Sequence, residues 1–95
     1  MESKDDYIKR LRDQLEDWNA QIAELRDKAD RARDEAQMEY HQELDELEGK
    51  RNVLRAHLDD LGSASEEAWT DKKHGADNAW MELDAAFNRA LMRLN

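Results

Sequence analysis

Apolar residues recur at intervals of three and four residues through the first third of the chain. Between Ile8 and Ala36 they occupy positions 8, 11, 15, 18, 22, 25, 29, 32 and 36. This alternation is the heptad pattern of an α-helix that carries one narrow apolar row. Because one helix cannot bury such a row by itself, the pattern predicts that other helices cover it.

The apolar row changes phase after Ala36 and then continues. Tyr40 and Leu44 follow at four-residue steps, which is a stutter in the heptads. The heptads resume with Leu47, Arg51, Leu54, Leu58 and Leu61. Since neither proline nor a strong stop signal interrupts this stretch, we expect one helix over about 4–61, with a length of about 90 Å. Arg51 is the charged residue of the row, and the sequence allows two roles for it equally well. Its side chain either reaches to solvent or forms a buried pair with Asp77.

Gly62-Ser63-Ala64-Ser65 is the one good break in the pattern. Gly62 suits a left-handed position after a helix, and Ser63 with Glu66 forms a capping box. We therefore expect a second helix over about 64–94. Its apolar stripe is Trp69, Ala76, Trp80, Leu83, Phe87, Leu91 and Leu94, and Ala68-Trp69, Ala79-Trp80 and Ala90-Leu91 repeat every eleven residues.

These elements predict an all-α, single-domain protein over residues 1–95, built as an antiparallel hairpin of a long and a shorter helix. Folding at Gly62 places Leu58 opposite Trp69 and carries the second helix back only to about Ala32. The first half of the long helix is then uncovered, so we expect a homodimer. The predicted interface residues are Ile8, Leu11, Leu15, Trp18, Ile22, Leu25, Ala29 and Ala32.

The same apolar row bears on whether the two chains of the dimer run parallel or antiparallel. Small residues at Ala29, Ala32 and Ala36 lie at the middle of the long helix and allow two antiparallel helices to cross closely. Isoleucine at one heptad position with leucine at the other instead favours parallel chains. A parallel pair would place Lys28 opposite Arg33, so the antiparallel arrangement is preferred.

Composition supports a helical protein and excludes several classes. Of 95 residues 41% are charged, with no proline, no cysteine and a net charge of -9. Such a mix is typical of coiled coils, and the unbroken heptads argue against disorder, the alternative for so polar a chain. Without cysteine there is no disulfide or thiolate chemistry. The acidic N-terminus predicts no signal peptide, and no window approaches the roughly 20 apolar residues of a membrane span.

Charge also bears on location and partners. We expect a cytoplasmic protein that does not contact nucleic acid directly, because acidic surfaces repel phosphates. Trp18, Trp69 and Trp80 raise the alternative of helices lying on a lipid surface. Interfacial helices usually carry lysine and arginine along the polar border, so packing in a core is preferred and membrane binding is not expected.

Candidate catalytic chemistry is sparse. The sequence contains no phosphate-binding glycine loop, zinc-ligand spacing or nucleophile elbow. The three histidines, His41, His57 and His74, fall on different helix faces. Glu35, Glu39 and Glu43 form one carboxylate stripe, which suits either a weakly held hydrated cation or, preferably, a solvated acidic face. We therefore predict a non-enzyme without cofactor or metal.

One stretch resembles a known family. Ser65-Glu66-Glu67-Ala68-Trp69, with Gly75, Asn78-Ala79-Trp80 and Ala85-Ala86-Phe87, is similar to the C-terminal signature of small bacterial coiled-coil stress proteins, also described as apolipoprotein-like. Tyr7, Leu11, Leu15, Trp18 and Tyr40 resemble the first helix of that family. The resemblance implies a bacterial, cytoplasmic helical hairpin that is induced under stress.

Two functions remain open on these grounds. The first is a structural or interaction module that acts through self-association and protein binding. The second is an acidic inhibitor that mimics nucleic acid phosphates and binds a nucleic-acid-binding protein. Fifteen lysine and arginine residues lie among the carboxylates and weaken the negative potential that a phosphate mimic requires. Arg12, Arg26 and Arg33 flank the apolar row, where they are suited to ion pairs between subunits. The interaction module is therefore preferred.

Overall fold

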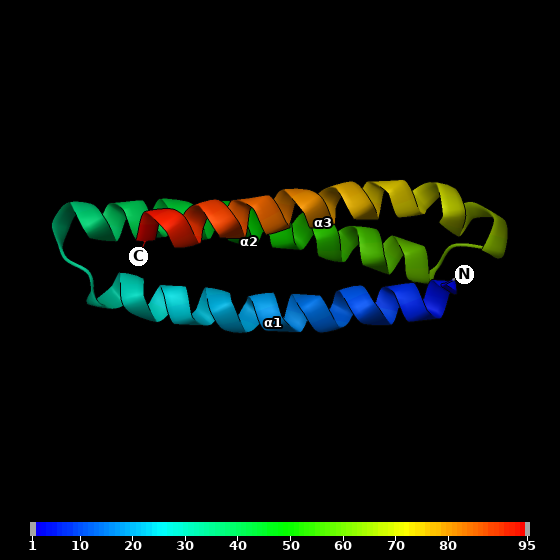
Figure 1. The fold of residues 1–95 in the computed structure, drawn as a ribbon, viewed down its shortest axis with the longest axis horizontal. Coiled ribbons are helices and arrows are strands. Elements are labelled where there is room, and N and C mark those ends of the chain that lie inside the picture. Colours follow the sequence, from blue (N-terminus) through cyan, green and yellow to red (C-terminus); the bar gives the residue numbers. More distant parts are fainter. Residues whose placement is uncertain (1, 95) are drawn as a thin grey trace.

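The computed structural model describes residues 2–94, which form three α-helices and no strand. The helices are α1 (Lys4–Arg31), α2 (Asp34–Gly62) and α3 (Glu66–Leu94). They pack as an up-down-up bundle in which α2 runs opposite to α1 and α3 (Figure 1). The bundle measures 51 × 19 × 17 Å. Residues 1 and 95 and the side chain of Leu94 lie outside the described part, and with them the predicted place of Leu94 in the apolar stripe.

The expected single helix over 4–61 is wrong, because the chain turns back in the middle of it. Ala32 and Arg33 are extended, with ψ of 157° and 147°, and Asp34 has a φ of 56°. We call these three residues the hinge. The two-helix hairpin is therefore corrected to a three-helix bundle, in which α1 folds onto α2 and α3 of its own chain.

Burial explains why the chain breaks a helix that its sequence could continue. The break forfeits roughly four helical hydrogen bonds worth about 1 kcal/mol each, and a left-handed residue other than glycine costs about 1–2 kcal/mol. Each large apolar side chain that becomes buried contributes about 1.5–3 kcal/mol. The buried residues of α1 are Tyr7, Leu11, Leu15, Trp18, Ile22, Leu25 and Ala29. Within a single chain these residues can be buried only if the chain turns back at the hinge.

Helix ends follow the expected chemistry in part. Ser3 caps α1, its Oγ accepting a hydrogen bond from the amide of Asp6 at 3.2 Å. At the start of α3 the cap is Ser65, which accepts from the amide of Ala68 at 3.2 Å, and not Ser63 as expected. Gly62 is the last helical residue of α2 and does not adopt the predicted left-handed conformation.

The core is formed by one face of each helix. Leu44, Leu47, Leu54, Leu58 and Leu61 line it from α2, and Ala76, Ala79, Leu83, Ala86, Phe87 and Ala90 from α3. Arg51 interrupts the leucine row of α2 and is half-buried, with its Nη1 donating to Oδ1 of Asn19 at 3.1 Å. The alternative of a pair between Arg51 and Asp77 is wrong, because the hydroxyl of Tyr7 binds that carboxylate instead.

The contacts between α2 and α3 lie between about one and two and a half helical turns further along α3 than the expected register. Lys72 pairs with Asp60 at 3.0 Å, and the ring of His57 lies against Gly75. Gly75 therefore makes room for the side chain of His57. A Cβ atom at this position would lie 3.0 Å from Cε1 of His57.

This contact yields a prediction for Gly75→Ala. Alanine in a helix is favoured over glycine by about 1 kcal/mol, but here the imidazole of His57 must move away. We expect Gly75→Ala to stabilise the protein by about 1 kcal/mol in a His57→Ala background and by less in the natural sequence. A double-mutant cycle measured by urea unfolding checks this difference. Equal effects in both backgrounds would show that His57 does not restrict the site.

Candidate functional site

Aromatic side chains fill the interface between α1 and α3 in two layers. In the first layer the ring centroids of Tyr7 and Trp69 are 6.1 Å apart. In the second, Trp18 lies 5.8 Å from Trp80 and stacks on Phe87 at 5.5 Å with an interplanar angle of 11°. Tyr7 and Trp18 are eleven residues apart, as are Trp69 and Trp80, so the repeat in α3 meets an equal spacing in α1.

Tyr7 is a core residue that the apolar row predicted from the sequence does not include. The heptad row was started at Ile8, but Tyr7 is completely buried and Ile8 is only half-buried. Its eleven-residue distance from Trp18, equal to the repeat in α3, is the signal that identifies it.

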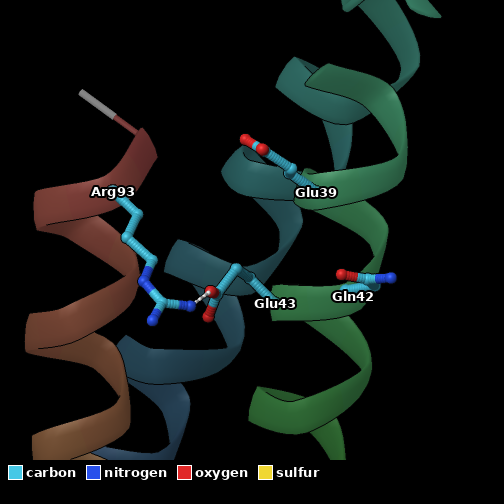
Figure 2. Close-up of a pocket in the computed structure, with 4 residues that line it drawn as sticks. All are labelled: Glu39, Gln42, Glu43 and Arg93. Carbon is cyan, nitrogen blue, oxygen red and sulfur yellow. Dashed lines mark hydrogen bonds and ion pairs between the residues drawn. The ribbon is translucent and has the colours of Figure 1, made fainter. Parts of the chain in front are cut away.

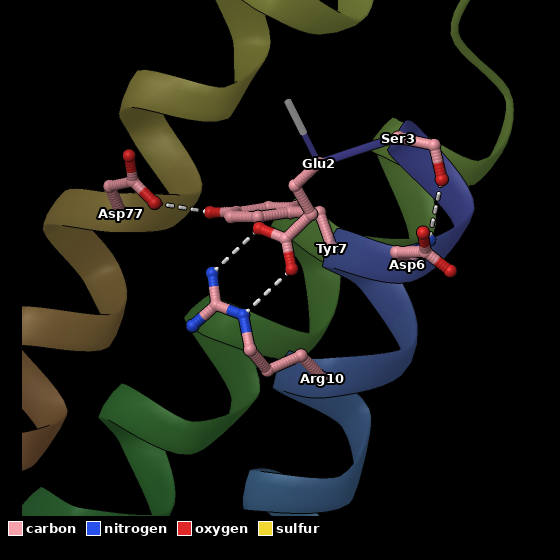
Figure 3. A network of polar contacts seen from close by, with 6 residues as sticks. All are labelled: Glu2, Ser3, Asp6, Tyr7, Arg10 and Asp77. Carbon is pink, nitrogen blue, oxygen red and sulfur yellow. Dashed lines mark hydrogen bonds and ion pairs between the residues drawn. The ribbon is translucent and has the colours of Figure 1, made fainter.

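A polar cluster surrounds the ring of Tyr7 at the end of the bundle where α1 begins. The hydroxyl of Tyr7 donates a hydrogen bond to Oδ1 of Asp77 in α3 (Figure 3). Arg10 binds both carboxylate oxygens of Glu2, at 3.0 and 3.1 Å, and its guanidinium lies 5.4 Å from the centroid of the Tyr7 ring. The ammonium group of Lys73 is 5.2 Å from the same centroid. The cluster thus ties the start of α1 to α3 through hydrogen bonding and cation–π contacts.

The chemistry of this cluster is that of a structural tie at neutral pH. Burial, together with the hydrogen bond to Asp77, raises the pKa of the Tyr7 phenol well above its ordinary value. The phenol therefore keeps its proton and acts as a hydrogen-bond donor.

This shift predicts how stability depends on alkaline pH. Because the folded state holds the Tyr7 proton more tightly than the unfolded chain, its contribution is complete below the unfolded pKa of about 10 and is lost as the pH rises through the folded pKa. We expect the free energy of unfolding to fall more steeply above pH 10 in the natural protein than in Tyr7→Phe, by at most about 1.4 kcal/mol per pH unit. Urea unfolding from pH 8 to 11 measures both slopes. Val53→Ala, which keeps both tyrosines, is the control, and parallel slopes for all three proteins would refute the assignment.

An open hollow of about 400 Å³ lies between the start of α2 and the end of α3, lined by Glu39, Gln42, Glu43 and Arg93 (Figure 2). Nη1 of Arg93 donates to Oε1 of Glu43 at 2.6 Å, and only 11% of the Glu43 side chain is exposed. One carboxylate of the predicted Glu35/Glu39/Glu43 stripe is thus neutralised by a guanidinium. In residues 2–94 no three histidine, cysteine, aspartate or glutamate side chains gather as a metal site would require.

The predicted interface residues lie mostly inside the chain's own bundle. Leu11, Leu15, Trp18, Ile22, Leu25 and Ala29 are buried by α2 and α3, while Ile8 and Ala32 are half-buried. Helices α2 and α3 of the same chain thus cover this apolar row. A role of these residues between two chains stays a prediction.

At the end of the bundle near the hinge, apolar residues continue beyond the part of the core that all three helices enclose. The first turns of α2 extend past the end of α3 (Figure 1). There Ala36 is exposed, Ala32 and Tyr40 are half-buried, and 37% of Leu91 is exposed. We call Ala32, Ala36, Tyr40 and Leu91 the hinge-end surface. Met92, in the last turn of α3, is 82% exposed.

Comparisons with protein-family models, curated proteins and solved structures find no match for this chain. Within the described residues, each helix falls short of the combined length and apolar content that crossing a bilayer requires.

Proposed function

We propose that this chain is a non-enzymatic interaction module that acts through self-association, as an antiparallel homodimer, and through protein binding. The observation that carries the proposal is the hinge-end surface. Its residues belong to or adjoin the rows that form the core elsewhere, yet here Ala36 is exposed, 37% of Leu91 is exposed, and Ala32 and Tyr40 are only half-buried. An apolar surface that continues beyond the enclosed core in this way is suited to contact with a further helix.

The charged surface supports this function better than phosphate mimicry. Glu43 is paired with Arg93, which leaves Glu35 and Glu39 as the solvent-facing members of the acidic stripe. Arg12 pairs with Asp59 at 3.0 Å, and Arg26 pairs with Glu48. These cross-helix ion pairs intersperse positive charge among the carboxylates, whereas a mimic of nucleic acid needs uninterrupted rows of negative charge.

The proposal is tested by charging the hinge-end surface. We expect the double variant Ala36→Glu/Leu91→Glu to lose both self-association and capture of a protein partner from the host extract. Val53→Glu, which places the same charge at an apolar position that is already 51% exposed, is the matched control and should keep both. Sedimentation and affinity capture at low and moderate salt provide the measurements.

Two results would overturn the proposal. If the double variant and Val53→Glu behave alike, the hinge-end surface is not the contact. If the natural chain captures a nucleic-acid-binding protein that moderate salt releases, the contact is electrostatic and the inhibitor function takes its place.

A further inference from the structure

The hinge is a strained turn in a segment whose sequence favours a helix. Asp34 is the one described residue other than glycine with a positive φ, at 56°. The segment from Lys28 to Tyr40 contains neither glycine nor proline and is rich in alanine, arginine and glutamate, which favour a helix. Aspartate visits the left-handed region more readily than most residues other than glycine, but this conformation still costs about 1–2 kcal/mol, and the packing of α1 on α2 and α3 holds the hinge in its shape.

The contacts that hold α1 in place do not depend on the hinge. Arg12 with Asp59, Asn19 with Arg51 and Arg26 with Glu48 join α1 to α2, and the midpoints of these pairs in sequence lie at 35–37, just after the hinge. The aromatic layers and the bond from Tyr7 to Asp77 join α1 to α3. Each of these contacts forms equally well with α1 of another copy, provided that the two copies are antiparallel.

Charge near the hinge also fits two antiparallel copies. Arg31 and Arg33 lie before or within the hinge, whereas Glu35 and Glu39 follow it. Antiparallel helices that cross at the hinge bring the basic side of one copy to the acidic side of the other. Parallel helices would place like charges together.

We propose that the partner of this chain is a second copy that exchanges α1 with it. In the exchanged dimer the hinge straightens, residues 4–62 form one continuous helix, and α1 of each copy covers α2 and α3 of the other. The two long helices cross at Ala32 and Ala36, which covers the hinge-end surface. This inference rests on the self-association proposed above and specifies its mechanism: the core contacts are kept, and strain at Asp34 is released.

The hinge itself supplies a matched pair of variants. Asp34→Gly accepts the left-handed conformation without strain and weakens a continuous helix, whereas Asp34→Ala disfavours the turn and strengthens the helix. Because each dimer contains two hinges, we expect the dissociation constant of Asp34→Ala to be lower than that of Asp34→Gly by a factor on the order of 1,000. Sedimentation over a range of concentrations measures both.

Exchange is distinguished from simple association by cross-linking, for which the cysteine-free chain is convenient. Arg12→Cys and Asp59→Cys chains are refolded together and treated with a short bismaleimide. Exchange predicts a covalent heterodimer. Asp13→Cys, at a neighbouring exposed position of α1 that pairs with Lys9 of the same helix, is the control and should give far less product with Asp59→Cys.

Three results would overturn the exchange. A dimer without the 12–59 cross-link means that α1 stays on its own chain, and self-association alone survives. Equal dissociation constants for the two Asp34 variants mean that the hinge does not govern the dimer. Monomers at every concentration for both variants refute the exchange and the proposed self-association together.

Discussion

Trp18→Ala is expected to lower the free energy of unfolding by about 3–5 kcal/mol, the usual cost of truncating a large buried aromatic residue. Only 4% of Trp18 is exposed, and its ring packs on Trp80 and Phe87 at 5.8 and 5.5 Å. Because α2 and α3 already meet across their own interface, the cavity left between α1 and α3 has little means of closing. The loss would remove a large share of the about 5–15 kcal/mol typical of a domain.

Urea unfolding followed by circular dichroism measures this loss. Val53→Ala removes apolar atoms from an exposed position of α2 and should change the stability by no more than about 0.5 kcal/mol. An effect of Trp18→Ala as small as that of Val53→Ala would show that the second aromatic layer does not form.

Leu47→Ala is expected to cost about 2–5 kcal/mol, because Leu47 is completely buried at the centre of α2, which packs extensively against both α1 and α3. Leu91→Ala provides the same chemical change at a residue that is 37% exposed in the last turn of α3. It should cost less than about 1 kcal/mol. Chemical unfolding of both variants under the same conditions gives the comparison, and similar losses would contradict the assignment of Leu91 to the uncovered end.

The helical class and much of the core could be predicted from periodicity alone. The rows from Leu11 to Ala29 and from Leu44 to Leu61 are buried as expected, and the break after Gly62 lies where the turn residues are. Periodicity succeeds here because each row faces one core, and a helix that buries one face must repeat its apolar residues every three to four positions.

The hinge could not be predicted in the same way, because its residues do not disfavour a helix. Ala32, Arg33 and Asp34 contain no glycine or proline, and the apolar row passes through them. The turn exists because it lets Tyr7 through Ala29 be buried within the same chain, a tertiary gain that local propensity does not record. The change of phase near Tyr40 marked the region without specifying a turn.

The apolar row of α1 could be predicted from the sequence, whereas the helices that cover it could not. The sequence identified the α1 row as an apolar surface in need of a cover, and α2 and α3 of the same chain provide one. Tyr7 and its bond to Asp77 were missed, because a tyrosine beside a regular heptad row looks like a flanking residue until α3 is placed against it.

The most direct test of this account is the distance between spin labels at positions 12 and 59 of the same chain. The measurement is made on a sample that sediments as a monomer. The fold-back at the hinge places α1 and α2 side by side, so we expect a distance below about 30 Å, since packed helices lie roughly 10 Å apart. A single uninterrupted helix would separate the two labels by about 70 Å. A distance near that value in the monomer would contradict the three-helix bundle and the hinge on which the exchange depends.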